Sequence, residues 1–255
     1  MLSPNDVQIL SYLDSFLEAN PNLFINEDSE YIFNGKKVPR VTTMLSRGIH
    51  TDELMKWANY IGLVEHKKYN PKTNEDATIG TQTHDCIDYF FRNNTEVSSY
   101  SNLPIEVKQA YLSFSQWYRD INSLAKVQIV SNEHKMVSKY YGGTLDALMD
   151  IDGKLYLVDF KTSKNMYTSY TLQLAAYAIL LDMLENIQLD GCILLQVSKT
   201  SIGYNEYVLT LDRPDHKMFF EECIHSFLRL VAWYYNFSYS ERNCNNVFNW
   251  NNKRW

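Results

Sequence analysis

The chain has 255 residues, of which 45% are hydrophobic and 21% are charged, and it contains only 6 prolines. This balance predicts a folded chain, excludes an intrinsically disordered one, and suits one large α/β domain. Lysine and arginine total 24 against 30 aspartates and glutamates, so the net charge of −6 disfavours a broadly basic nucleic-acid coat protein but permits a local basic patch.

Several other classes of protein are disfavoured by missing motifs. No run of about 18 apolar residues is present, so no membrane-spanning helix is expected. The N-terminal residues lack the basic stretch of a targeting sequence, and we expect a soluble protein inside the cell. The 4 cysteines form no close pair, which argues against a zinc or iron–sulfur site. No Gly-rich nucleotide-binding motif occurs either.

Hydrophobic spacing predicts a mostly helical first half. Helices are expected over roughly 5–18, 51–64, 80–91 and 103–122. Asn34-Gly35 predicts a hairpin turn between short strands at 31–33 and 38–42. The polar segment 65–77 has no periodicity and is expected to be a mobile loop.

The second half is expected to form the sheet. Predicted strands cover 127–130, 135–140, 143–151, 154–160, 191–198 and 204–211, and the turn Asp152-Gly153 joins the third to the fourth. Helices are expected over 169–186 and 214–237. This order predicts one domain over 1–255 with a mixed sheet flanked by helices: a helical part (1–125) that covers the cleft, an αβ core (126–240) and a frayed tail (241–255).

Two aspartates in neighbouring predicted strands carry the strongest chemical signal. Asp146 lies among apolar residues, and Asp159 follows the apolar run 155–158. Across a two-residue turn at Asp152-Gly153, residues whose numbers add up to 305 face each other, as 146 and 159 do. The two carboxylates are therefore expected side by side, about 5 Å apart.

Such a pair calls for a cation, because two close carboxylates repel each other at neutral pH. Mg²⁺ prefers carboxylate and water oxygens. Lys161 follows Asp159 by two residues, so it lies on the same face of the strand and can stabilise charge on a phosphate. The alternative is a surface hairpin with solvated aspartate and lysine side chains, which the apolar neighbours of both aspartates disfavour.

At this point the residues resemble a known family. Asp146 with Asp159-Phe160-Lys161 resembles the motif of the PD-(D/E)XK nuclease superfamily, and 143–146 resembles its GxxD part. Segment 80–84 resembles the histidine motif of the RecB-like branch, and 173–177 resembles its QxxxY motif. Segments 38–45 and 54–57 resemble phage exonucleases and mitochondrial genome maintenance exonuclease. The resemblance spans about residues 31–180 and implies a restriction-endonuclease-like fold with N-terminal helical insertions.

The resemblance also implies roles for single residues. The ligands of Mg²⁺ or Mn²⁺ would be His84, Asp146, Asp159 and the backbone carbonyl of Phe160. Lys161 would be the catalytic lysine, with Gln173 and Tyr177 lining the site and orienting Lys161 or the phosphate. Glu133, on the preceding strand, is a candidate for a second metal or a supporting role. The expected contacts to nucleic acid are Thr162, Lys164, Gln173 and Tyr177. Relatives with an iron–sulfur cluster carry a cysteine group after the core that this chain lacks, so no cluster is implied.

The implied activity is metal-dependent hydrolysis of DNA by an exonuclease that acts on single strands or ends, in replication, recombination or repair. A cytoplasmic protein of a bacterial or phage-infected cell fits this activity. Three alternatives stay open: a structure-specific endonuclease of the same superfamily, a non-catalytic binding module, and a subunit that needs a helicase or recombination protein as partner. Alone, His84 would more often be structural, and the aromatics Phe90, Phe91, Trp117 and Tyr118 are expected in the core rather than on bases.

Overall fold

The computed structural model describes residues 2–21, 29–49, 75–95, 97 and 102–248 of the chain. Five strands form one mixed sheet in the order β3-β4-β5-β6-β7. They are β3 (Val127–Val137), β4 (Gly142–Ile151), β5 (Lys154–Lys161), β6 (Gly191–Val197) and β7 (Tyr204–Thr210). The pair β5–β6 is parallel and the other neighbours are antiparallel. The prediction of a mixed sheet flanked by helices is confirmed.

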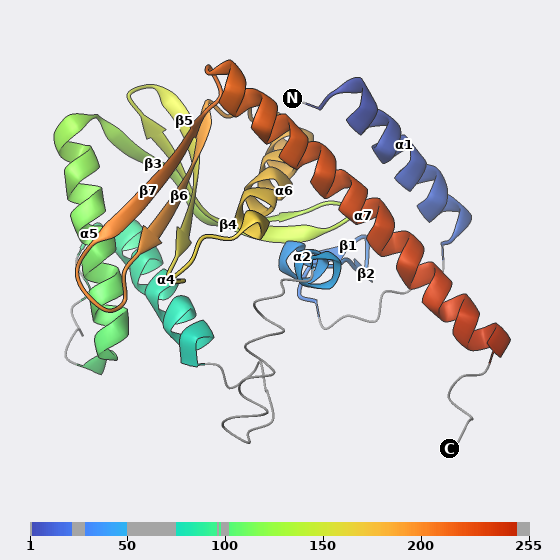
Figure 1. Ribbon diagram of the computed structural model, residues 1–255, viewed down its shortest axis with the longest axis horizontal. Helices are drawn as coiled ribbons and strands as arrows, with labels where there is room; N and C mark the ends of the chain where they lie inside the picture. The colour runs from blue at the N-terminus through green and yellow to red at the C-terminus, as the bar shows by residue number, and fades with distance from the viewer. Residues whose placement is uncertain (1, 22–28, 50–74, 96, 98–101, 249–255) are drawn as a thin grey trace.

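Helices cover both faces of this sheet (Figure 1). On one face lie α4 (Glu75–Asn93) and α5 (Ile105–Leu124). Their aromatic residues pack with the side chains of β4, β5 and β6 that point to that face, and Phe114 and Trp117 are fully buried there. Phe90, Phe91 and Tyr118 pack against the same cluster, as expected for core aromatics.

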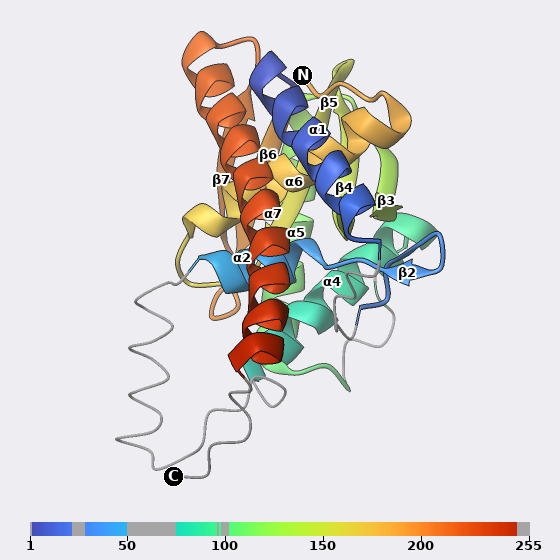
Figure 2. The same cartoon turned by 90° about the vertical axis from the view of Figure 1, so that its right-hand side faces the viewer.

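The opposite face is covered by α6 (Thr168–Glu185) and α7 (Pro214–Phe248). Helix α6 connects the parallel strands β5 and β6, the usual crossover for such a pair. It ends at Asn186, whose φ of 53° is the left-handed conformation that often terminates helices. Two N-terminal helices, α1 (Pro4–Ala19) and α2 (Val41–Gly48), pack on α7, and Figure 2 shows α1 lying along it.

Local sequence explains where several elements begin. Ser3 caps α1 in a capping box with Asp6, and Pro4 occupies the first turn. Asp6 also lies 3.0 Å from His225 Nδ1 on α7, which ties the two helices together. Burial raises the pKa of Asp6, but the hydrogen bonds from Ser3 and His225 outweigh it and the pKa is lowered. Both predicted hairpin turns are confirmed, because Asn34-Gly35 and Asp152-Gly153 have positive φ at both positions.

The first half differs from the prediction in two places. Strand β2 (Lys36–Lys37) pairs with β1 (Ile32–Phe33), so the strand expected at 38–42 is wrong. From Val41 the chain is helical instead, because Val41, Met44 and Leu45 have helical spacing and bury one face of α2. Helix α4 begins at Glu75, five positions before the predicted start, so 75–77 are not loop. The helix predicted at 51–64 and the rest of the predicted loop lie outside the described residues.

The second half differs in extent rather than in kind. The two short strands expected at 127–130 and 135–140 are one continuous strand, β3, with a register shift between Ile129 and Ser131. Such a shift interrupts the alternation of polar and apolar residues that marks a strand in the sequence. Helix α7 continues to Phe248, so residues 241–248 are helical rather than frayed. No described helix is both long enough and apolar enough to cross a membrane.

Candidate metal centre

The site lies where β4 and β5 separate, beside the N-terminal half of α4. The predicted facing register is confirmed from Ile151 and Lys154 up to Ala147 and Val158. One residue further, the carboxylate of Asp146 replaces the regular ladder and accepts a hydrogen bond of 2.7 Å from the Phe160 N–H. At the end of the hairpin a side chain therefore takes the place of a backbone partner.

Three side chains converge on one side of this gap. His84, Glu133 and Asp146 each present a ligand atom, and these atoms lie within 4.8 Å of one another. His84 Nδ1 is 3.4 Å from Asp146 Oδ1, and its Nε2 is 3.0 Å from the carbonyl oxygen of Phe160. The predicted ligands His84, Asp146 and the Phe160 carbonyl are thus brought together, and Glu133 joins them.

Glu133 reaches the group through an unusual backbone. Its neighbours Asn132 and His134 pair with Ala147 and Leu145, so Glu133 lies opposite Asp146. Its φ is 45°, a conformation that residues other than glycine rarely adopt. His134 contacts Glu185 on α6, on the other side of the strand, as alternation predicts.

Asp159 and Lys161 lie on the α6 side of the gap. Lys161 Nζ is 2.6 Å from Asp159 Oδ2, which confirms that the two side chains share a face. Asp159 is 1% exposed, and neither of its carboxylate oxygens accepts a well-aligned hydrogen bond from the described residues. Asp159 is not part of the His84 group. A buried carboxylate of this kind has unused acceptor capacity for a cation.

Helix α6 holds the lysine in place. Lys161 Nζ donates to Gln173 Oε1 over 3.1 Å, and Gln173 Nε2 donates to the Tyr177 hydroxyl over 2.9 Å. Both predicted residues therefore contact Lys161 directly or through one neighbour. Tyr170, which was not predicted as a site residue, also contacts the lysine: its ring centroid lies 4.8 Å from Lys161 Nζ. Its spacing of three residues before Gln173 on the same helical face was the available signal.

The pKa values of these groups are shifted because several carboxylates lie close together in a partly or fully buried place. Burial, together with the charge of Asp146, raises the pKa of Glu133 to about 7. Burial likewise raises the pKa of Asp159 to about 6, although Lys161 opposes the shift. Burial acts to lower the pKa of His84, but the neighbouring Asp146 outweighs it and raises the value to about 9. The metal-free site therefore retains protons that a divalent cation would displace.

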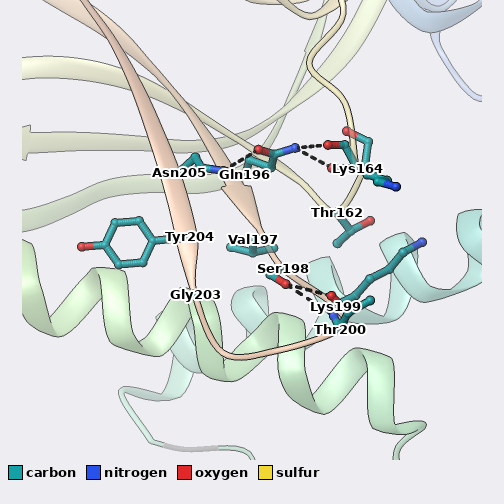
Figure 3. Close-up of a pocket in the computed structure, with 11 residues that line it drawn as sticks. Thr162, Lys164, Gln196, Val197, Ser198, Lys199, Thr200, Gly203, Tyr204 and Asn205 are labelled. Atoms are coloured by element: carbon teal, nitrogen blue, oxygen red, sulfur yellow. Dashed lines mark hydrogen bonds between the residues drawn. The ribbon is translucent and has the colours of Figure 1, made fainter.

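The other predicted contacts lie just beyond the end of β5. Thr162 is half-buried and lies beside Gly80 of α4. A Cβ added to Gly80 would be 3.4 Å from the Thr162 hydroxyl. Lys164 is exposed two residues later. Both line a cavity of about 580 Å³ (Figure 3).

No known protein-family profile matches the sequence, and no curated protein matches it. Several solved structures are distantly similar, and two of them are described here. The crystal structure of SSO0001 has 14% sequence identity and a TM-score of 0.27 over 70% of this chain and 86% of its own. A phage related exonuclease from Haemophilus somnus 129PT has 10% identity and a TM-score of 0.37 over 81% of this chain and 96% of its own.

Proposed function

We propose that this chain is a divalent-metal-dependent DNA exonuclease of the RecB-like PD-(D/E)XK type, which hydrolyses phosphodiester bonds in single-stranded DNA or at DNA ends. One observation carries the proposal. A histidine, two carboxylates and a backbone carbonyl converge within ligand reach, next to a partly buried lysine that is paired with a third carboxylate. A phage-encoded role in replication, recombination or repair is part of this proposal.

The residues present fit a divalent cation. Asp159 has buried oxygens without aligned donors, Glu133 and Asp146 add carboxylates, and His84 contributes an imidazole nitrogen. Carboxylate, carbonyl and imidazole ligands suit Mn²⁺, and the oxygens among them suit Mg²⁺. When bound by these residues, a divalent cation would lower the pKa of a water molecule and would offset the negative charge of a phosphate.

Lys161 supplies the second positive charge. Burial acts to lower its pKa, but Asp159 and Asp146 outweigh it, so the pKa is raised and the ammonium stays charged. An ammonium has three N–H donors. Gln173 accepts one of them, and Asp159 pairs with the ammonium at 2.6 Å. We assign a further N–H donor of Lys161 to the attacking water or to a non-bridging phosphate oxygen. In this position the lysine stabilises the charge that develops during in-line displacement.

Gln173 and Tyr177 act as positioning residues for Lys161. Tyr177 is buried in the core, and its hydroxyl accepts a hydrogen bond from the Gln173 amide. The orientation of Tyr177 therefore fixes the orientation of Gln173, which contacts the lysine. Thr162 and Lys164, directly after β5, are proposed to contact the phosphates next to the scissile one. Dependence on a helicase or recombination protein stays an alternative proposal, and the assay described next distinguishes it from a self-sufficient nuclease.

The test is a digestion assay with the wild type and two variants. Lys161→Ala removes the proposed catalytic lysine, and Lys154→Ala is the matched control, because Lys154 lies at the other end of the same strand. The substrates are end-labelled linear single-stranded DNA, linear duplex and closed circles, each with Mg²⁺, Mn²⁺ or EDTA.

Metal-dependent release of short products from linear DNA is expected from the wild type and from Lys154→Ala. Lys161→Ala is expected to be slower by at least about 100-fold, the usual loss when a charge-stabilising donor is removed. Cutting of circles would establish an endonuclease instead. Binding without cleavage by any of the proteins would contradict a self-sufficient nuclease and favour a binding module or a partner-dependent subunit.

A further inference from the structure

A cavity of about 580 Å³, lined mostly by residues with polar side chains, opens beside the end of β5, between the residues that follow Lys161 and the loop that joins β6 to β7. Its volume is typical of ligand-binding clefts. Two of the residues lining it are lysines, Lys164 and Lys199, and none of the described lining residues is acidic. In a chain with a net charge of −6, this local excess of positive charge is a specific feature.

The cavity adjoins the candidate metal centre through the sheet itself. Strands β5 and β6 are parallel, so their carboxyl ends lie at the same edge, where ligands commonly bind in open α/β sheets. Lys161, the last residue of β5, pairs with Gln196 of β6, which lines the cavity. A strand of nucleic acid that leaves Lys161 in the direction of β6 therefore enters this cavity.

One wall is fixed by a buried amide. Gln196 is 9% exposed, and its Nε2 donates to the carbonyl oxygens of Ser163 (2.8 Å) and Lys164 (2.9 Å). Its Oε1 accepts from Asn205 Nδ2 of β7 over 2.9 Å. Figure 3 shows these bonds joining both strands to the segment that carries Lys164. The amide is fully used in holding this backbone, so the segment is preorganised rather than free to move.

The other wall is fixed from α5. The hydroxyl of the fully buried Ser113 lies 3.0 Å from the carbonyl oxygen of Ser198 and accepts from the Gly203 N–H over 3.0 Å. With its amide oriented so that both polar atoms are satisfied, Gln109 donates to the carbonyl oxygen of Lys199 over 2.7 Å. Helix α5 therefore holds both ends of the turn that presents Lys199.

The two lysines extend from these fixed walls toward the same side of the cavity, whereas Tyr204 extends in the opposite direction (Figure 3). Thr162 and Ser198 add hydroxyl groups between them. Ammonium and hydroxyl donors on a preorganised backbone match the non-bridging oxygens of a phosphodiester chain. None of these groups presents a pattern specific to one base.

We infer that this cavity is a subsite for the sugar–phosphate backbone of a single DNA strand, in which Lys199 on the β6–β7 loop and Lys164 contact phosphates flanking the one at the metal centre. This inference rests on the proposed function. It adds that Lys199 and the β6–β7 loop bind the DNA strand, and that the strand lies on the β6 side of the metal centre. Recognition through phosphates alone makes the subsite indifferent to base sequence.

The test measures binding in EDTA, so that it does not depend on catalysis. The probe is a fluorescein-labelled oligothymidylate, titrated by anisotropy at several NaCl concentrations with the wild type, Lys199→Ala, Lys164→Ala and the control Lys154→Ala. Each phosphate contact to a single strand contributes about 0.7 to the slope of log affinity against log salt. Loss of one contact is therefore expected to reduce that slope by about 0.7 and to weaken binding about fivefold at 0.1 M NaCl.

The expected result is this change for Lys199→Ala and for Lys164→Ala, with wild-type binding by Lys154→Ala and unchanged melting temperatures. A peptide nucleic acid of the same base sequence, which has no phosphates, is expected not to bind. Wild-type affinity and salt slope in Lys199→Ala would overturn the subsite, even if the protein cleaves DNA. Normal binding with the predicted lysine effects, in a protein that cleaves nothing, would overturn the nuclease and leave the subsite standing.

Discussion

Gly143 lies where β4 passes beneath the aromatic ring of Tyr177, and Gly143→Ala tests whether that packing controls the site. A Cβ at this position would lie 2.6 Å from Tyr177 Cε1 and 3.1 Å from Val41 Cγ2. Carbon atoms pack at about 3.5–4.0 Å, so the ring must move by roughly 1 Å. Tyr177 is 3% exposed and α6 is packed on both sides, which leaves the ring little room to move.

Two effects of known size follow from this displacement. Overpacking a buried site destabilises a protein by about 1–3 kcal/mol, which lowers the melting temperature of a chain of this length by roughly 2–12 °C. The same shift moves the hydroxyl that fixes Gln173, which in turn holds Lys161. A displacement of about 1 Å in catalytic geometry lowers rates by up to about 100-fold. DNA cleavage is therefore expected to fall more steeply than stability alone accounts for.

Gly80→Ala is the matched control, because a Cβ at Gly80 would meet only Thr162 Oγ1, at 3.4 Å. Within α4, this exchange is expected to raise stability by about 0.5–1 kcal/mol and to leave cleavage unchanged. Both variants are assayed by thermal melting and by initial cleavage rates well below the melting temperature. Wild-type melting and wild-type rates in Gly143→Ala would refute the argument that Tyr177 packing positions the lysine.

Three further predictions concern other contacts. Glu133→Gln is expected to lower the apparent affinity for Mn²⁺, measured by thermal melting, about 10- to 100-fold. It is not expected to lower the melting temperature in EDTA, because a half-buried carboxylate with a pKa of about 7 is replaced by a neutral amide. Asp6→Ala is expected to lower the free energy of unfolding, measured with urea at pH 7, by about 1 kcal/mol. The pKa of Asp6 is lowered below 3.8 in the folded chain, partly through His225. The difference between the variant and the wild type should therefore vanish as the pH falls through that lowered value. Tyr170→Leu is expected to slow cleavage about two- to fivefold, whereas Tyr170→Phe, which keeps the ring over Lys161, should stay within twofold; equal rates in both variants would contradict the cation–π contact.

The parts of the fold that the sequence predicts well are those in which local chemistry decides the structure. Asn34-Gly35 and Asp152-Gly153 are turn dipeptides, and the second of them alone sets the register that brings Asp146 toward Asp159. The start of α2 was missed because Val41-Thr42 has high strand propensity, whereas tertiary packing against α6 and α7 favours the helix.

In the candidate site too, local sequence predicts some features, whereas others depend on tertiary structure. Lys161 and Asp159 were predictable as neighbours, because alternation along one strand suffices. The position of Glu133 opposite Asp146 depends on a register shift in β3 and on a left-handed residue, neither of which leaves a pattern in the sequence. Likewise, Gln196 reads as one more residue of a strand in which every side chain is buried, and only the tertiary structure shows that its amide holds the segment after Lys161.

The packing of α1 on α7 has a consequence for how the chain folds during translation. Asp6 and His225 are separated by 219 residues, so during translation α1 leaves the ribosome roughly ten to forty seconds before its docking surface is made. In that interval its apolar residue Leu13, fully buried in the finished protein, has no partner on α7. Helix α1 is thus synthesised well before the surface on which it packs, and its apolar side chains stay without that surface until α7 has been made.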